Sequence, residues 1–169
     1  YFTGFKLLWF SRIIVNLTLY MNTCPKLELL IVDDDPVVAL MHARVLKDFT
    51  FETKPRFLSN GVEALEFIKT HSDPDTTFLV FLDLLMPVMD GWDFLDQCKD
   101  LDNQQQICVF VITSSILSND LFRALKYKNV MGFSNKPFTR ESMISLLDFP
   151  AVKDLFLQME YEALEDGTW

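Results

Sequence analysis

Short apolar runs alternate with longer amphipathic stretches along most of this chain, and this alternation restricts its fold more than any other feature. The clearest apolar runs are Leu27–Val32, Phe78–Leu82 and Ile107–Ile112. Nearly continuous apolar runs of this length are typical of strands that are buried on both faces. The stretches between them are long enough to return the chain as helices. The pattern therefore predicts an α/β fold, with a doubly wound parallel sheet covered by helices on both faces.

Five strand–helix units can be placed along the chain. Two weaker strands are expected at Arg56–Leu58 and Val130–Phe133. Five helices are expected at Pro36–Lys47, Val62–His71, Trp92–Lys99, Asn119–Lys128 and Arg140–Phe149. Asp35 is expected to cap the first helix, because an aspartate commonly precedes a helix whose first position is proline. The sequence thus predicts a (βα)5 layout with a five-stranded parallel sheet over residues 27–149.

An apolar extension, residues 1–26, precedes this layout. Its apolar part, residues 7–21, is shorter than the about 20 residues needed to cross a bilayer, and Arg12 lies near its middle. We expect no membrane span, and we interpret residues 1–20 as upstream sequence without a role. Two alternatives stay open. Lys6 precedes the apolar stretch as in a membrane-surface anchor or export signal, and Cys24 could carry a lipid, although residues 21–23 are not the small residues of a cleavage site.

A tail, residues 150–169, follows the last predicted helix. Beyond Pro150, apolar residues recur at helical spacing, which predicts a helical tail that packs on its own domain. About twenty residues are too few to form an output domain. We therefore expect a stand-alone protein rather than one with a second domain.

Charge and cysteine content restrict the partners and the compartment. The net charge is −9, and residues 1–26 contribute +3, so residues 27–169 stand at −12. Such an acidic surface repels phosphate backbones and argues against nucleic-acid binding. The three cysteines are odd in number and match no metal-ligand spacing, which fits a reducing, cytoplasmic compartment.

Ionisable and hydroxyl residues follow the predicted strands where such sheets bind ligands, at the carboxyl ends. They are Asp33 and Asp34 after the first strand, Asp83 after the third, Thr113 after the fourth and Lys136 after the fifth. Three converging carboxylates repel one another, and a divalent cation such as Mg²⁺ relieves that repulsion. A carboxylate can also act as a nucleophile and form an acyl phosphate, which a hydroxyl and an ammonium would help to stabilise. Individually, each of these residues has a simpler role as a helix cap, a turn residue or a surface charge.

Four segments together resemble the response-regulator receiver family of two-component signalling. They are LLIVDDDP (29–36), FLDLLMPVMDGWDFL (81–95), VITSS (111–115) and NKPF (135–138). The resemblance implies a flavodoxin-like fold in which a histidine kinase or a histidine phosphotransfer protein phosphorylates Asp83. It also implies that Asp33, Asp34, Asp83 and the backbone carbonyl of Leu85 hold Mg²⁺.

The resemblance further implies which residues respond to phosphorylation and how a downstream protein recognises the phosphorylated state. Thr113 would contact the phosphoryl group, Lys136 would pair with it, and the Lys136–Pro137 bond would be cis. Phe133 matches the switch aromatic of the family and would turn inward on phosphorylation. The surface around it would then change and be sensed by a downstream protein. Alternatively, Phe133 is an ordinary core residue without a role in switching.

Two other functions are alternatives to a phosphoacceptor. A Mg²⁺-dependent hydrolase similar to haloacid-dehalogenase-like phosphatases would place its nucleophile after the first strand with a threonine beyond, and the segment from Asp33 to Val37 lacks that threonine. A scaffold that is never phosphorylated would be expected to lack an essential residue, and none is missing. His42 and His71 are interpreted as ordinary surface or boundary residues.

Overall fold

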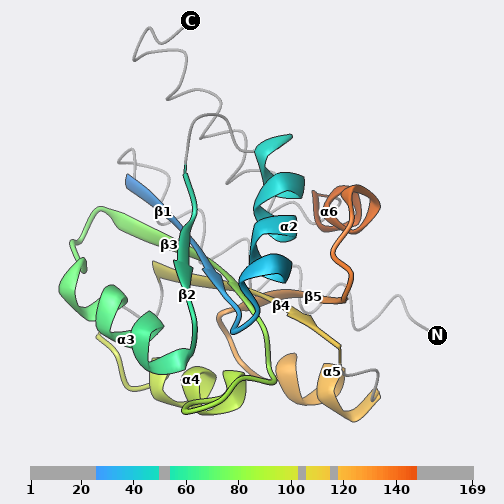
Figure 1. The fold of residues 1–169 in the computed structure, drawn as a ribbon. Helices are drawn as coiled ribbons and strands as arrows, with labels where there is room; N and C mark the ends of the chain where they lie inside the picture. Colours follow the sequence, from blue (N-terminus) through green and yellow to red (C-terminus); the bar gives the residue numbers. More distant parts are fainter. Residues whose placement is uncertain (1–25, 50–53, 103–105, 115–117, 148–169) are drawn as a thin grey trace, which may run out of the picture.

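The computed structural model describes residues 26–49, 54–102, 106–114 and 118–147. Within these ranges strands and helices alternate along the chain (Figure 1). The strands are β1 (Lys26–Val32), β2 (Arg56–Leu58), β3 (Thr76–Leu82), β4 (Ile107–Thr113) and β5 (Val130–Asn135). The helices are α2 (Pro36–Lys47), α3 (Gly61–Thr70), α4 (Gly91–Cys98), α5 (Ser118–Ala124) and α6 (Arg140–Leu147). The predicted N-terminal extension, apart from Lys26, and the predicted helical tail lie outside the described residues.

All five strands belong to one parallel sheet with the order β2-β1-β3-β4-β5. The strand order reverses between β1 and β3, which is where doubly wound sheets bind their ligands. These two strands are in register along their whole length, from Lys26 opposite Thr76 to Val32 opposite Leu82. The structure therefore confirms the predicted α/β fold and its five-stranded parallel sheet.

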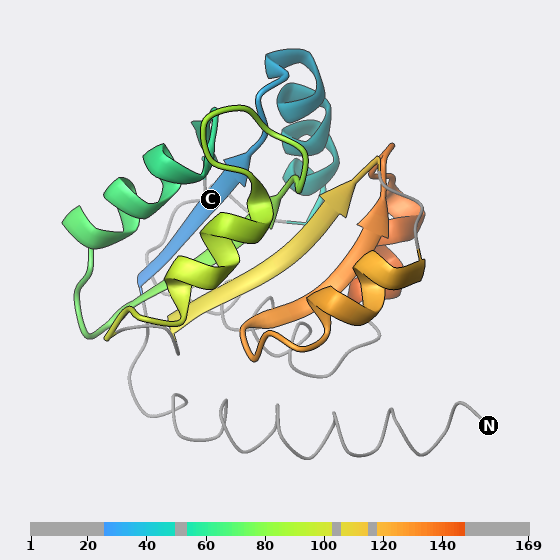
Figure 2. The same cartoon turned by 90° about the horizontal axis from the view of Figure 1, so that it is seen from below.

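Helices cover both faces of this sheet, with α2 and α6 on one face and α3, α4 and α5 on the other (Figures 1 and 2). Alternate side chains of each strand point to opposite faces of the sheet. Leu30 and Val32 join the cluster that contains the buried residues of α3 and α4, whereas Leu29 and Ile31 join the cluster below α2 and α6. Every residue of β3 is buried. The continuous apolar runs in the sequence thus correspond to strands packed on both sides.

Local sequence signals explain where several elements begin and end. Asp35 caps α2 as predicted, because its side chain accepts hydrogen bonds from the amides of Val37 (2.8 Å) and Val38 (3.3 Å). Helix α5 ends at Ala124, four residues before the predicted end. The amide of Tyr127 there bonds to a carbonyl three residues back, in a tighter turn that directs its ring into the core. Strand β5, in contrast, continues two residues beyond the prediction, because it pairs with β4 as far as Thr113.

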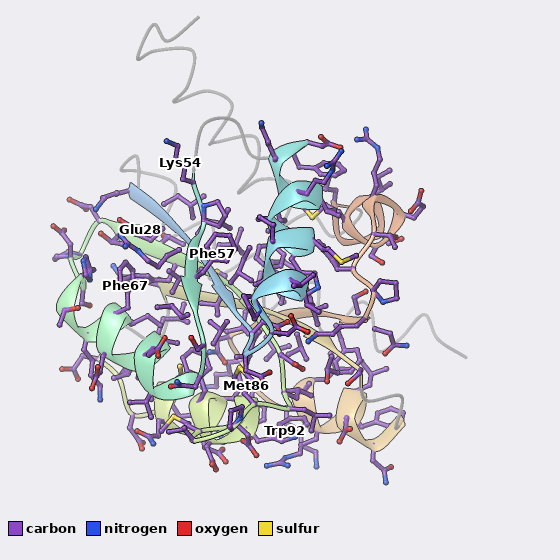
Figure 3. The ribbon with its side chains drawn as sticks, viewed as in Figure 1. Glu28, Lys54, Phe57, Phe67, Met86 and Trp92 are labelled. Atoms are coloured by element: carbon purple, nitrogen blue, oxygen red, sulfur yellow. The ribbon has the colours of Figure 1, made fainter. Side chains whose placement is uncertain are left out.

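One edge of the sheet is formed by the short strand β2. Phe57 of this strand is exposed, and the guanidinium of Arg56 lies 5.1 Å from the ring centroid of Phe67 on α3. Figure 3 shows Phe57 and Phe67 on their two elements. This edge lies next to β1, and the carbonyl of Leu58 at the end of β2 accepts a hydrogen bond from the amide of Asp33 (3.0 Å).

Two findings concern the environment of the protein. Cys98 is buried in the core, Cys108 is half-buried, and both are free thiols. Among the residues that the structure describes, no helix combines the length and the apolar character needed to cross a membrane.

Candidate functional site

Three aspartates meet at the carboxyl ends of β1 and β3. The amide of Asp83 donates a hydrogen bond to the carbonyl of Val32 (2.9 Å), so the tips of the two strands lie side by side. One carboxylate oxygen from each of Asp33, Asp34 and Asp83 lies within 4.8 Å of the others. Asp33 and Asp83 are buried, whereas Asp34 is exposed. The convergence expected from the sequence is present, and it concentrates negative charge at one spot.

Lys136 supplies positive charge to this group of acids. Its amide bonds to the carbonyl of Thr113 (2.9 Å), which carries the chain from β5 back toward the tip of β4. The Nζ atom lies 2.6 Å from Asp83 Oδ2 and 2.7 Å from Asp33 Oδ2. Burial by itself would lower the pKa of this ammonium, but hydrogen bonding to the two carboxylates outweighs burial and raises it. Lys136 is therefore charged at neutral pH. The cis peptide bond expected at Lys136–Pro137 is present.

The acidic group has the chemistry of a divalent cation site. Asp33 Oδ1 accepts a hydrogen bond from the amide of Asp35 (3.1 Å). Asp33 Oδ2 is buried, and the Lys136 ammonium lies 2.7 Å from it, at ion-pair distance. A buried carboxylate oxygen beside two further carboxylates is a suitable ligand for a hard cation. The three aspartates are therefore able to bind a metal ion.

The remaining predicted residues lie around this group. The amide of Leu85 donates to Asp83 Oδ1 (3.2 Å), while its side chain is exposed. Thr113 ends β4 and is fully buried. Phe133 pairs in register with Val111 and is half-buried against the cluster that also contains residues of α3 and α4. Of this set, Thr113 and Leu85 are held next to the acidic group by hydrogen bonds to Lys136 and Asp83.

His42 is the residue for which the sequence interpretation was wrong. It is buried, not a surface or boundary residue, and its Nδ1 lies 3.9 Å from Asp33 Oδ2. Its ring meets Phe138 edge-on, with centroids 5.9 Å apart. Burial lowers the pKa of this imidazole, and the nearby Asp33 only partly opposes that effect. The spacing could have revealed this position, because Ala39, His42 and Leu46 repeat on the inward face of α2. His71, in contrast, is exposed as expected.

Comparison with known proteins supports a common origin for this arrangement. A sequence profile described as the response regulator receiver domain matches residues 29–148. The probable methanogenesis regulatory protein FilR2 of Methanothrix harundinacea is 30% identical over 118 residues, which cover 68% of this chain and 75% of that protein. The chemotaxis protein CheY of Halobacterium salinarum is 28% identical over 120 residues, which cover 71% of this chain and 92% of that protein.

Solved structures share the fold. The Mn²⁺-bound form of response regulator Rcp1 superimposes with a TM-score of 0.56 at 24% identity, covering 86% of this chain and 97% of that one. Several curated relatives are longer, and the chain spans about half of their length. What those longer proteins do as a whole therefore does not transfer directly to this chain.

Proposed function

Because this chain belongs to the response-regulator receiver family, we propose that Asp83 accepts a phosphoryl group from a histidine kinase or a histidine phosphotransfer protein. The observation that carries this proposal is the position of Lys136, whose ammonium touches both Asp83 and Asp33 in the middle of the acidic group. A carboxylate beside an ammonium and two further carboxylates can act as a nucleophile toward phosphorus while its own charge stays balanced.

The transfer would proceed at a carboxylate whose two oxygens are both oriented. An oxygen of Asp83 attacks the phosphorus of the phosphohistidine, the P–N bond breaks, and its electron pair returns to the donor imidazole. The products are an aspartyl phosphate and a free histidine. The Leu85 amide holds Asp83 Oδ1, and the Lys136 ammonium holds Oδ2 at 2.6 Å. These contacts fix the carboxylate plane before the donor arrives. Afterwards the ammonium pairs with the phosphoryl oxygens.

We propose that Asp33, Asp34 and Asp83, with the backbone carbonyl of Leu85, hold Mg²⁺. The three converging carboxylates, which offer only oxygen ligands, support this choice. The Mn²⁺ in the Rcp1 structure also supports it, since Mn²⁺ and Mg²⁺ both prefer oxygen ligands. When bound, Mg²⁺ would neutralise charge on the phosphoryl group during transfer.

The proposal includes a conformational switch. Thr113 would move toward the phosphoryl group, and Phe133 would turn inward into the space that this movement opens. Both residues lie on the paired strands β4 and β5, and Phe133 is only half-buried, so an inward turn would increase its burial. The surface of α5 and β5 would then differ between the two states, and a downstream protein would recognise that difference.

The proposal also covers the domain boundaries, the type of activity and the cellular compartment. Residues 27–149 form the receiver, and 1–26 and 150–169 flank it. The chain catalyses only its own phosphorylation and dephosphorylation, so it is a signalling module and not an enzyme acting on other substrates. A cytoplasmic setting is consistent with the free thiols of Cys98 and Cys108.

Phosphorylation with acetyl phosphate tests the site. The full chain, incubated with acetyl phosphate and Mg²⁺, should gain one phosphoryl group by intact-protein mass spectrometry. Asp83→Asn should gain none, because an amide cannot form the acyl phosphate. Asp75→Asn is the matched control, since Asp75 is an exposed aspartate before β3 at the opposite end of that strand. Uptake by Asp83→Asn equal to that of the unmodified protein would refute the assignment.

A further inference from the structure

The buried imidazole of His42 is a polar group that the proposed phosphotransfer does not use. It occupies the inward face of α2 between Ala39 and Leu46, and only 3% of it is exposed. Within the described residues its Nε2 has no hydrogen-bond partner. Burying a polar ring with an unsatisfied nitrogen costs free energy that an apolar side chain would avoid. Packing alone therefore does not explain a histidine at this position.

The other ring nitrogen faces the acidic group. His42 Nδ1 lies 3.9 Å from Asp33 Oδ2, the oxygen with which the Lys136 ammonium now pairs at 2.7 Å. A typical N–H···O distance is about 2.9 Å, so a movement of about 1 Å would join the two atoms. The charges favour the neutral tautomer with its proton on Nδ1, which points the N–H toward a carboxylate. A proton on Nε2 would instead be a buried donor without an acceptor.

The orientation of the ring is fixed from its other side. Phe138 meets the imidazole edge-on at 5.9 Å and an interplanar angle of 86°. Phe138 follows Lys136 by two residues, so His42 contacts both the carboxylate of Asp33 and the loop that positions the ammonium. Lys136 is the group that now balances Asp33, at 2.7 Å from Oδ2.

We propose that His42 is a positioning residue of the metal site, which hydrogen-bonds Asp33 through Nδ1–H when Lys136 turns to the phosphoryl group on Asp83. This inference rests on the proposed function. On phosphorylation Asp33 would lose the Lys136 ammonium, and His42 is the other described side chain placed to hold Asp33 Oδ2 toward the metal. Partners behind a metal ligand fix its orientation and typically change metal affinity by about 10- to 100-fold.

Three variants of the full chain test this role. His42→Leu keeps a side chain of similar size and removes the donor. His42→Asn places an amide nitrogen near the position of Nδ1. His71→Leu is the matched control, because it removes the exposed histidine of α3's C-cap. The Mg²⁺ dissociation constant is measured by calorimetry in the presence of beryllofluoride, which mimics the phosphoryl group. The free energy of unfolding is measured in urea without metal.

The expected results separate positioning from packing. His42→Leu should bind Mg²⁺ at least about 10-fold more weakly, while its free energy of unfolding stays equal or rises, because a buried polar ring has been removed. His42→Asn should recover most of the affinity, and His71→Leu should keep all of it. Equal Mg²⁺ binding by His42→Leu and the unmodified protein would overturn the inference.

The tautomer gives a second measurement that needs no variant. Imidazole ¹⁵N–¹H correlation spectra of the unmodified protein with Mg²⁺ and beryllofluoride should show the His42 proton on Nδ1. A neutral ring protonated on Nε2 would overturn the inference even if Asp83 is phosphorylated as proposed. Failure of Asp83 to accept a phosphoryl group would overturn the proposed function, and this inference with it, so the two failures are distinguishable.

Discussion

Lys136 and Asp83 are joined by a hydrogen bond of 2.6 Å between Nζ and Oδ2, although 53 residues separate them in the sequence. The same ammonium lies 2.7 Å from Asp33. It therefore sits between two of the three carboxylates that we propose as Mg²⁺ ligands. Mg²⁺ and the Lys136 ammonium would bind the same carboxylate oxygens. The two cations should therefore compete.

Removal of this ammonium should strengthen metal binding while weakening the fold without metal. In Lys136→Met, Mg²⁺ no longer displaces a bound cation, so its dissociation constant should fall several-fold. Without metal the buried carboxylates of Asp33 and Asp83 lose their partner, and the free energy of unfolding should decrease by about 1–3 kcal/mol. Calorimetry and urea unfolding with and without Mg²⁺ measure both effects.

Lys126→Met is the matched control for this experiment, because Lys126 is exposed and follows α5 away from the acids. It should change neither quantity appreciably. Mg²⁺ binding by Lys136→Met that is weaker than in the unmodified protein would show that the lysine assists the metal instead of competing with it.

Gly91 allows α4 to begin directly against the backbone that follows β3. Its amide bonds to the carbonyl of Leu84 (3.1 Å). A Cβ atom here would overlap the backbone oxygen of Asp83 and lie 2.8 Å from Leu84 Cα. Because backbone atoms cannot turn aside, Gly91→Ala should displace α4 or Asp83 and lower the free energy of unfolding by about 1–3 kcal/mol.

Gly61→Ala is the contrasting variant. There an added Cβ would meet the flexible side chain of Met89, at 2.7 Å from Cγ and 2.9 Å from Sδ. A rotamer change can relieve that contact, and alanine favours the helix by up to about 1 kcal/mol. Urea unfolding should therefore show a clearly smaller loss than for Gly91→Ala, and an equal or larger loss would contradict the steric explanation.

Much of the fold was predictable because the chain repeats one physical pattern. The buried runs at β1, β3 and β4 can be recognised from composition, and the Asp35–Pro36 pair marks the start of α2. The end of α5 was not predictable from periodicity. Tyr127 and Leu121 continue an apolar stripe that fits a helix, but contacts between elements draw Tyr127 into the core, where its hydroxyl bonds to Asp96 of α4 (3.0 Å).

The acidic group was predictable for a different reason. Residues that directly follow parallel strands meet at one sheet edge, so the proximity of Asp33 and Asp83 can be inferred from the sequence. His42 could not be linked to them, because it lies within a helix and its distance from Asp33 depends on how α2 packs on the sheet. The spacing along α2 indicates only that His42 faces inward, not which residue it meets.

The lowered pKa of His42 predicts an acid-dependent loss of stability. Burial disfavours the imidazolium, so the folded protein takes up this proton at a lower pH than the unfolded chain, whose histidine has a pKa near 6.5. Below that value the unfolded state binds more protons, and the free energy of unfolding decreases as the pH falls toward the folded pKa. Above about pH 6.5 this contribution is constant.

His42→Leu should flatten this dependence. Urea unfolding between about pH 7.5 and about pH 5.5 should show a shallower decrease in this variant than in the unmodified protein. An NMR titration of the His42 ring provides the direct measurement. A pKa at or above 6.5 in the folded protein would contradict the burial argument.

Trp92 of α4 should report the proposed movement of α5. The guanidinium of Arg123 lies 4.0 Å from the centroid of the Trp92 ring, and the Tyr127 ring is 6.2 Å away. Figure 3 shows Trp92 on the side of α4 that faces α5. A cation over an indole ring alters its fluorescence, so a shift of α5 that carries Arg123 away should change the emission. We expect this change when beryllofluoride and Mg²⁺ are added.

Variants separate this signal from that of Trp9 and Trp169. Trp92→Phe should abolish the change, and Asp83→Asn should prevent it by removing the carboxylate that binds beryllofluoride. Arg123→Gln should reduce it at little cost to folding, because an exposed cation–π contact contributes only about 0.5–1 kcal/mol. A full-sized change in Trp92→Phe would mean that another tryptophan responds. No change in the unmodified protein, despite binding of beryllofluoride, would mean that α5 keeps its contacts with α4 in both states, and the partner surface would then have to lie elsewhere.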